Sequence, residues 1–408
     1  MSTSDSSRLN LLVASHGYWP VLGGAERLAA EVSEGLAARG HTVRVMTPVA
    51  VRDMDGDRVP DAEEERNGVE IQRIRPTPTE AWMGVRVHRR PGIAAKFVRK
   101  RVKGRVTTRF ARSLDASLVA APADVVLALP HLTPTVRAAV RVASAHKLAL
   151  SLVPMLHEDS KKWPAPEMRD ALALADSVIA GTQHEATRLT ESYDVDADAI
   201  RIAGTGAEPI SHPAPWPRQA RVLFLGRKVE QKGIAELFQA MAHVWRKRPD
   251  VELVLAGPPS TTIVDRLRAK LPAPQRQQVC SLDSVSEQAK EELLGGTACL
   301  VLPSREESFG IVLLEAWGAR TPVVTTDTPV LRCVVDHGVN GLLVRRDDPA
   351  ALGASLLRLL NDASFAEQLG GNGYAKLMKK HRWRHVVDVY EAGLWLAVER
   401  SQKRRTRA

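Results

Sequence analysis

Two glutamates with seven residues between them follow an apolar run in the second half of the chain. Glu307 comes shortly after the run 298–302, and Glu315 lies in the apolar stretch I-V-L-L-E-A-W-G. A carboxylate can accept two hydrogen bonds from sugar hydroxyls, and a glutamate on an apolar helix is rarely buried without a partner. The pair therefore suits a sugar-bearing ligand. The plainer interpretation is a helix-capping acid followed by a solvated glutamate.

The residues between the two glutamates are expected to begin a helix near Gly310. Unpaired backbone N–H groups at a helix start favour an anion. The groups that would face such an anion belong to Ser308, Phe309, Gly310 and Ile311. Hydroxyl acceptors at both ends with anion donors between them are what a nucleotide-sugar requires.

Two further loops offer phosphate chemistry. Arg227 and Lys232 flank a short loop after the predicted strand 221–225, where two cations and a helix start suit a diphosphate. Gly23 and Gly24 follow the first predicted strand and would let a ligand approach the backbone closely. The loop is not G-x-G-x-x-G, so a dinucleotide site is not indicated. Solvated cations and a tight turn remain the simpler interpretations of these two loops.

The elements that must hold these loops alternate along the chain. Helical periodicity predicts helices over 25–39, 233–246 and from Ile311, whereas the polar, acidic residues 50–66 are expected to form a loop. The short apolar runs predict strands at 9–15, 41–47, 69–75, 124–129, 148–153, 177–180, 221–225, 251–256, 298–302, 322–325 and 341–344. Four prolines within 209–217 indicate a linker. The pattern predicts an α/β protein with two doubly wound, Rossmann-like domains facing a cleft.

Length and composition restrict the class of protein. The chain has 408 residues, enough for two domains with sizeable cores, and its 44% hydrophobic and 25% charged residues are ordinary for globular proteins. Three cysteines without a C-x-x-C pair predict neither a disulfide framework nor a zinc site. No apolar run reaches the ~20 residues of a membrane-spanning helix, and the first residues lack a signal-peptide pattern. We therefore expect a cytoplasmic protein.

The net charge of +10 comes from one segment. Arg86–Arg112 contains eleven Lys or Arg and no Asp or Glu, and a second basic cluster occupies residues 400–407. A local basic surface indicates a local anionic partner. We expect weak, salt-sensitive binding to an anionic membrane or a phosphorylated acceptor, and the alternative is a solvated surface with a frayed tail. Phe97 and Phe110 are too few aromatics for a nucleic-acid platform, so no nucleic-acid partner is expected.

The order and spacing of several short motifs resemble the retaining glycosyltransferases of family 4, which have the two-domain GT-B fold. The resemblance extends over nearly the whole chain. It rests on Gly23–Arg27, Gly40–Val43, Ala175–Ala180, Gly226–Gly233, Leu302–Glu315 and Asn340–Val344. It implies an N-terminal acceptor-side domain (1–210), a C-terminal nucleotide-sugar domain (218–378), a helix (379–400) that crosses back to the first domain, and a basic tail (401–408).

The resemblance also implies a role for each site residue. Arg227 and Lys232 would hold the donor diphosphate and stabilise the leaving nucleotide. Glu315 would bind the ribose, and Glu307 would contact the transferred sugar. Gly23 and Gly24 would line the cleft, and His157, in V-P-M-L-H-E-D, would be the active-site histidine.

The family transfers sugar to a hydroxyl acceptor with retention and, in this interpretation, without a metal or other cofactor. Arg227, Lys232 and helix N-termini would offset the charge that develops on the diphosphate. The acceptor would be a glycan, a lipid-linked sugar or a small molecule. The basic segment would place the enzyme peripherally on the inner face of the membrane.

Departures from the family pattern leave base and sugar selectivity open. Thr328–Leu331 replaces the usual glycine pair and Pro-Glu, Gly204–Glu208 replaces the usual Asn-Gly-Val-Asp turn, and Ala256–Pro259 replaces a more glycine-rich turn. Two other functions are consistent with the motifs: an inactive GT-B module that binds nucleotide-sugars, and another GT-B enzyme such as a sugar-nucleotide epimerase or phosphorylase.

Overall fold

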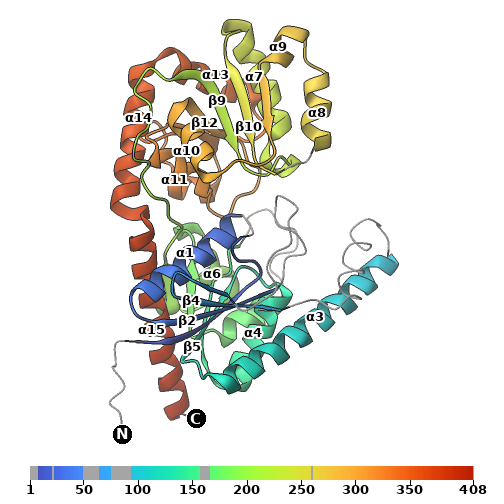
Figure 1. Cartoon of the computed structure of the whole chain (residues 1–408), viewed down its shortest axis with the longest axis vertical. Helices are drawn as coiled ribbons and strands as arrows, with labels where there is room; N and C mark the ends of the chain where they lie inside the picture. Colours follow the sequence, from blue (N-terminus) through green and yellow to red (C-terminus); the bar gives the residue numbers. More distant parts are fainter. Residues whose placement is uncertain are drawn as a thin grey trace. The chain divides into compact units, whose positions relative to one another are not determined.

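The computed structural model describes residues 8–20, 23–48, 64–74, 93–156, 166–258 and 261–407, with the backbone alone for 93–106 and 261–262. The chain divides into two compact units (Figure 1). Of the described residues, those up to Leu156, those from Pro166 to Ala203 and those from Val386 onwards form the first unit, and Gly204–His385 form the second. A mostly parallel sheet with connecting helices forms each unit, which confirms the predicted α/β class with two doubly wound halves.

The sheet of the first unit has the strand order β3-β4-β2-β1-β5-β6-β7-β8. Strands β1, β5, β6 and β7 are buried almost throughout, because helices shield a parallel sheet on both faces. The strands are β1 Asn10–Ser15, β2 Thr42–Pro48, β3 Glu64–Arg66, β4 Val69–Ile74, β5 Val125–Leu129, β6 Ala149–Leu152, β7 Ser177–Ala180 and β8 Ile200–Ile202.

Strand β3 corrects the prediction that residues 50–66 form a loop. Glu64–Arg66 pairs antiparallel with β4, and Asn67 and Gly68 join the two strands with φ values of 49° and 78°. Positive φ at both central residues is what a two-residue hairpin turn requires, and Asn-Gly is its strongest sequence signal. The strand remains polar because it lies at the edge of the sheet.

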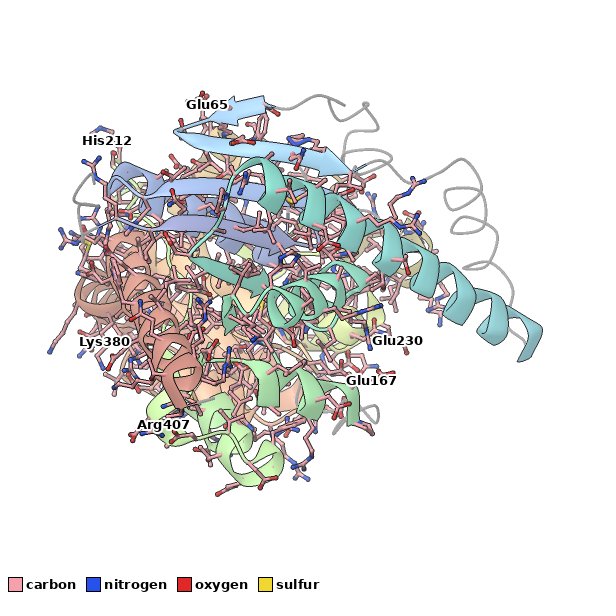
Figure 2. The ribbon with its side chains drawn as sticks, turned by 90° about the horizontal axis from the view of Figure 1, so that it is seen from below. Glu65, Glu167, His212, Glu230, Lys380 and Arg407 are labelled. Carbon is pink, nitrogen blue, oxygen red and sulfur yellow. The ribbon has the colours of Figure 1, made fainter. Side chains whose placement is uncertain are left out.

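The helices of the first unit are α1 Gly24–Ala38, α3 Ile93–Ala120, α4 Pro134–Ala145, α5 Pro166–Leu174, α6 Gln183–Tyr193, most of α15 Trp383–Arg407, and the 3-10 turn Ala197–Ala199. Helix α3 packs on α4, and its N-terminal part extends beyond the rest of its unit in both views (Figures 1 and 2).

Helix α15 continues through the basic residues that were expected to form a separate tail. It ends at Arg407, labelled in Figure 2, rather than near residue 400. Three basic residues of α15 have partners elsewhere in the first unit: Arg400 and Arg404 form ion pairs with Asp196 and Asp176, and Arg405 donates to the carbonyl of Lys147. These contacts account for the longer helix.

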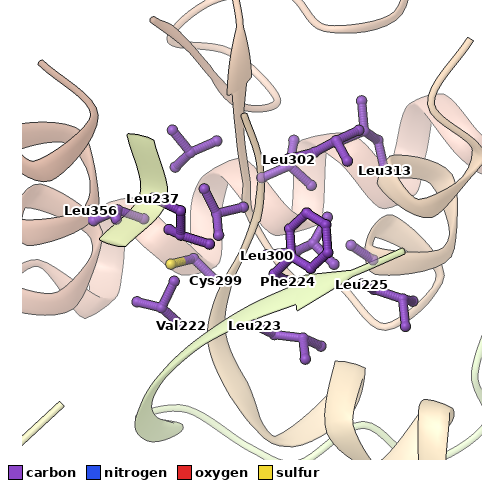
Figure 3. Packing of buried hydrophobic residues seen from close by; sticks show 14 of the residues in the cluster. Val222, Leu223, Phe224, Leu225, Leu237, Cys299, Leu300, Leu302, Leu313 and Leu356 are labelled. Atoms are coloured by element: carbon purple, nitrogen blue, oxygen red, sulfur yellow. The ribbon is translucent and has the colours of Figure 1, made fainter. Parts of the chain in front are cut away.

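The sheet of the second unit is parallel throughout, in the order β11-β10-β9-β12-β13-β14. Figure 3 shows the side chains of β9 and β12 packed with Leu237, Leu313 and Leu356 from three helices. The strands are β9 Gln219–Leu225, β10 Glu252–Ala256, β11 Val279–Leu282, β12 Thr297–Leu302, β13 Val323–Thr326 and β14 Leu342–Val344.

The helices of the second unit are α7 Ile234–Lys247, α8 Thr261–Ala269, α9 Ala273–Gln277, α10 Glu287–Gly296, α11 Ile311–Gly318, α12 Pro329–Val334, α13 Pro349–Asn361 and α14 Ala363–Lys376, with short turns at Glu230–Lys232 and Leu377–His381. The proline-rich segment 209–217 belongs to this unit. The N–H of Ile210 donates to the carbonyl of Gly318 at 2.9 Å, and that of Ala214 to Gly295 at 3.2 Å. Among the described helices of both units, none is long and apolar enough to cross a membrane.

Candidate functional site

The strand order of the second sheet reverses between β9 and β12, and this switch point brings two candidate loops together. The loop after β9 contains Arg227 and Lys232, and the loop after β12 leads to Glu307. They touch directly, since the N–H of Arg305 donates to the carbonyl of Gln231 at 2.9 Å. Ligands of open α/β sheets bind at the carboxyl ends of strands beside such a reversal.

Gly233 makes this close approach of the two loops feasible. Its φ is +71°, in the left-handed region, and a Cβ atom there would lie 2.0 Å from the carbonyl oxygen of Pro303. Any other side chain would push the loops apart. The glycine after Lys232 thus sets the separation between the cations of one loop and the carboxylate of the other.

Lys232 and Glu307 form an ion pair at the point where the loops meet. Their side chains are 18% and 11% exposed, so most of their surface is removed from water. Ser304 adds a second bond to the same carboxylate, with its hydroxyl donating to Glu307 Oε1 at 3.0 Å. The structure therefore joins two residues that lie 75 positions apart and that the sequence assigned to the diphosphate and to the sugar.

Glu315 lies on α11 and pairs with a lysine of α10. Lys290 Nζ is 3.0 Å from Glu315 Oε1, and the Glu315 side chain is only 9% exposed. Its neighbours Leu314 and Ala316 are fully buried. The expectation that a glutamate in this apolar helix needs a partner is met by Lys290, which the sequence analysis did not single out.

Helix α11 begins directly after the loop that contains Glu307. Gly310 has φ +89° and precedes the first helical residue, Ile311, so the predicted helix boundary is confirmed. Phe309 is buried, and Ser308 is half-buried between it and Glu307. The backbone groups named for anion binding thus adjoin the carboxylate named for the sugar.

Arg227 and Lys228 have opposite environments at the end of β9. Among the residues that the structure describes, Arg227 is exposed and has no ion-pair partner. Lys228 is 1% exposed, and its Nζ donates to Ser281 Oγ at 2.9 Å, to the carbonyl of Leu282 at 3.1 Å and to Asp283 Oδ1 at 2.6 Å. All three ammonium hydrogens are satisfied, so Lys228 fixes the β9 loop to the end of β11.

In the first unit, Gly23 and Gly24 are exposed at the start of α1. The Glu26 carboxylate lies against Gly23, where a Cβ atom would be 2.2 Å from Glu26 Oε2. His16, directly after β1, also feels the Glu26 charge, although desolvation dominates and lowers the pKa of its imidazole. Neither His16 nor Glu26 was predicted to be a site residue, although the position of His16 in S-H-G, at the end of a strand, could have indicated it.

His157, the candidate active-site histidine, lies outside the described residues, as do residues 86–92 of the basic segment. From Ile93 the segment belongs to α3, and its described side chains begin at Thr107. In the described part of the chain, no group of three or more His, Cys, Asp or Glu side chains is arranged to hold a metal ion.

Two family models match consecutive parts of the chain. "Glycosyltransferase Family 4" matches residues 22–209, and "Glycosyl transferases group 1" matches residues 212–376. Together they include both candidate loops and the Gly23 turn. The chain belongs to glycosyltransferase family 4.

One relative of this family 4 chain is a D-inositol 3-phosphate glycosyltransferase from Nocardia farcinica, 29% identical over 62% of this chain and 61% of that protein. The match thus spans about three fifths of that relative's length. The structure resembles sucrose-phosphate synthase from Thermosynechococcus elongatus (TM-score 0.69, 20% identity, 97% and 98% of the two chains). It also resembles Anabaena Alr3699/HepE in complex with UDP-glucose (TM-score 0.68, 16% identity, 94% and 98%). These solved structures share the GT-B fold.

Sequence reasoning missed three partners in the second unit of this family 4 chain: Ser304, Lys228 and Lys290. Ser304 directly follows Pro303 after a buried strand, a location that could have marked it. The lysines carry no such signal, because R-K-V-E-Q-K and E-Q-A-K-E-E both resemble solvated surface. Only the tertiary structure determines which lysine is buried.

Proposed function

We propose that this chain transfers a sugar from a nucleoside-diphosphate sugar to a hydroxyl acceptor, with retention of the anomeric configuration and without a metal ion. The observation that carries the proposal is the meeting of Lys232 and Glu307 at the switch point of the second sheet. The bond to be broken joins a phosphate to a sugar. The cation suits the phosphate, and the adjacent carboxylate suits the hydroxyls of the sugar.

Each residue then has a definite task. Arg227 and Lys232 bind the diphosphate, and the N–H groups at the start of α11 add a partial positive charge. Glu315 accepts hydrogen bonds from the ribose, and Glu307 accepts them from the transferred sugar. The loop that contains Glu307 continues into α11 through the backbone of Ser308, Phe309, Gly310 and Ile311.

The reaction breaks the bond between the anomeric carbon and the phosphate oxygen, and the acceptor oxygen forms the new bond to that carbon. The acceptor proton passes to the departing phosphate oxygen, on the same face of the sugar, so the configuration is retained. The cations offset the negative charge that grows on the diphosphate and so lower the barrier. An inverted product or a trapped glycosyl-enzyme would exclude this route.

The first unit supplies the acceptor side in this proposal. Gly23 and Gly24, at the start of α1, would admit the acceptor and the donor phosphates, and His157 would be the active-site histidine. The related D-inositol 3-phosphate glycosyltransferase makes phosphorylated polyols the first acceptors to try. UDP-glucose, present in the HepE complex, is the first donor to try.

The proposal includes a membrane partner. Basic residues of α3 would bring the enzyme onto an anionic, inner-face membrane surface, where lipid-linked acceptors lie. The support is the absence of acidic residues from 86–112 and the extension of α3 beyond its unit (Figure 1).

The deciding experiment is calorimetric titration with UDP, GDP, ADP and dTDP, with and without EDTA. We expect one nucleotide to bind at micromolar concentration, to be insensitive to EDTA, and to fail with the Arg227→Ala/Lys232→Ala double variant. Unchanged binding by the double variant would refute the diphosphate site. An acceptor assay follows: a transferase needs an acceptor for nucleotide release and leaves a glycoside. Conversion of the nucleotide-sugar with its nucleotide still attached would favour an epimerase, and no reaction at all an inactive binding module.

A further inference from the structure

Lys290 is a nearly buried cation that the proposed chemistry has not yet used. It lies on the first turns of α10, and its Nζ is 3.0 Å from Glu315 Oε1 and 2.7 Å from Glu287 Oε2. The Lys290 side chain is 13% exposed and that of Glu315 is 9% exposed, whereas Glu287 is 62% exposed. Of the two ion pairs that Lys290 forms, the one with Glu315 is therefore the one that is shielded from water.

The surroundings of Glu315 explain why it needs this cation. Helix α11 is apolar, and Leu313, Leu314, Ala316 and Trp317 are all fully buried. A carboxylate in such surroundings loses hydration and is costly unless a cation or hydrogen-bond donors replace the water. Lys290 supplies a cation from a neighbouring helix and also restricts the rotamers that the Glu315 side chain can adopt.

We propose that Lys290 is a positioning residue for the ribose of the donor nucleotide. It holds the Glu315 carboxylate in one orientation, in which the carboxylate accepts hydrogen bonds from the ribose hydroxyls. Hydrogen bonds weaken steeply when their geometry is poor, so a Glu315 side chain that is free to change its rotamer binds the ribose less tightly. The inference rests on the proposed function, in which Glu315 binds that ribose.

The proposal makes a prediction that a merely structural lysine would not. Because Lys290 acts through Glu315 on the ribose hydroxyls, its removal weakens binding only of nucleotides that have those hydroxyls. A 2′,3′-dideoxy nucleotide lacks both groups, so it should not distinguish the variant from the native protein. The two substitutions, in the protein and in the ligand, form a double-mutant cycle.

The experiment titrates the full chain with UDP and 2′,3′-dideoxy-UDP, or with the GDP pair if GDP is the nucleotide that binds. The proteins are the native chain, Lys290→Met, Lys290→Arg, Glu315→Gln and the control Lys270→Met, an exposed lysine of the same unit. We expect Lys290→Met to weaken the ribonucleotide about tenfold and to leave the dideoxy nucleotide within about twofold. Lys290→Arg should restore part of the loss, and Lys270→Met should match the native chain.

Each other outcome overturns the proposal. Equal weakening of both nucleotides by Lys290→Met would make the lysine a structural support, and no weakening of either would remove its role. If Lys290→Met does not fold, Lys290→Arg and Glu315→Gln still measure the ribose discrimination. If the native chain binds both nucleotides equally well, Glu315 does not hold the ribose. If it binds neither, the proposed function fails, and this inference with it.

Discussion

Lys232 and Glu307 neutralise each other where the proposed donor diphosphate would bind. The same carboxylate oxygen, Oε1, also accepts a hydrogen bond from Ser304, so two side chains hold it. An incoming diphosphate must therefore compete with Glu307 for the lysine. The same contact that assembles the site weakens its attraction for a nucleotide that carries no sugar.

The first prediction follows from this competition. Glu307→Gln should bind UDP about three- to tenfold more tightly than the native chain. In this variant, binding no longer requires the free energy needed to break the mostly buried ion pair between Lys232 and Glu307. The same variant should transfer sugar far more slowly, since Glu307 is proposed to contact the sugar. Calorimetry and a transfer assay on one protein preparation measure both effects.

The neighbouring acid provides the control for that prediction. Glu306 lies in the same loop and has no task in the proposed site, so Glu306→Gln should leave UDP affinity and transfer unchanged. UDP binding by Glu307→Gln that is equal to or weaker than the native value would show that the ion pair does not restrain Lys232.

The second prediction concerns the attachment of α15 to the first unit. His41 is buried, its Nδ1 accepts the N–H of Leu9 at 3.0 Å, and its Nε2 lies 2.9 Å from Glu391 Oε1. Because Nδ1 is an acceptor, Nε2 carries the proton and donates to the carboxylate. His41→Ala leaves the Leu9 N–H without a partner and should lower the free energy of unfolding by about 2 kcal/mol.

Urea denaturation followed by circular dichroism measures this loss. The matched control is His146→Ala, since His146 also pairs with a carboxylate, that of Asp115, but its side chain is 43% exposed. That pair is solvated and should contribute less than about 1 kcal/mol. Equal losses in the two variants would contradict the structural role assigned to His41.

The third prediction is a pH dependence centred on Glu185. Its carboxylate is buried and accepts the N–H groups of Leu156 at 2.6 Å and Gly181 at 2.7 Å. Burial dominates and raises the pKa of the Glu185 carboxyl to about 7, from 4.5. The folded chain therefore takes up a proton near pH 7, which the unfolded chain takes up only near pH 4.5.

The sign follows from that difference in pKa. Between those two pH values the folded state binds more protons than the unfolded state, so this group increases stability as the pH falls. At about 1.4 kcal/mol per pKa unit, its contribution changes by up to ~3 kcal/mol. In melting curves at pH 8, 7, 6 and 5, the melting temperature of the native chain should rise relative to that of Glu185→Gln as the pH falls. Parallel curves would refute the raised pKa.

Much of the fold could be predicted because the buried strands are continuous apolar runs. Val125–Leu129 and Ser177–Ala180 lie where their hydrophobicity placed them. The meeting of the Arg227 and Glu307 loops also followed from topology, since parallel strands end on the same edge. The strands that were missed are short or polar: β3, β8 and β11 bury few side chains, so their hydrophobic pattern is weak.

The polar interior of the site could not be predicted in the same way. Lys228 reaches the end of β11 across β10, and the chain after β10 lies so close to that after β9 that a Cβ atom at Gly257 would be 2.2 Å from the carbonyl oxygen of Gly226. Lys290 meets Glu315 only because α10 and α11 pack together. Such contacts depend on the packing of distant segments, which no local pattern records.

The fourth prediction tests the basic surface of α3. Arg101, Arg105 and Arg112 follow one another at helical spacing along α3, and Arg112 is exposed. Attraction between such a row of cations and anionic lipid is worth about 1 kcal/mol per residue near the surface and is screened within about 10 Å at 0.1 M salt. The native chain should therefore sediment with phosphatidylserine-containing vesicles at low salt and be released at high salt.

The triple variant Arg101→Glu/Arg105→Glu/Arg112→Glu should remain in the supernatant at every salt concentration. It should bind nucleotide like the native chain, because the substitutions lie in the first unit and the donor loops lie in the second. Neutral phosphatidylcholine vesicles and a triple Arg→Gln variant separate charge from other effects, and Arg→Gln should give intermediate binding. If the native chain ignores phosphatidylserine vesicles at low salt, the basic segment does not bind membranes. A phosphorylated acceptor then becomes its partner to test, by titration with inositol phosphate.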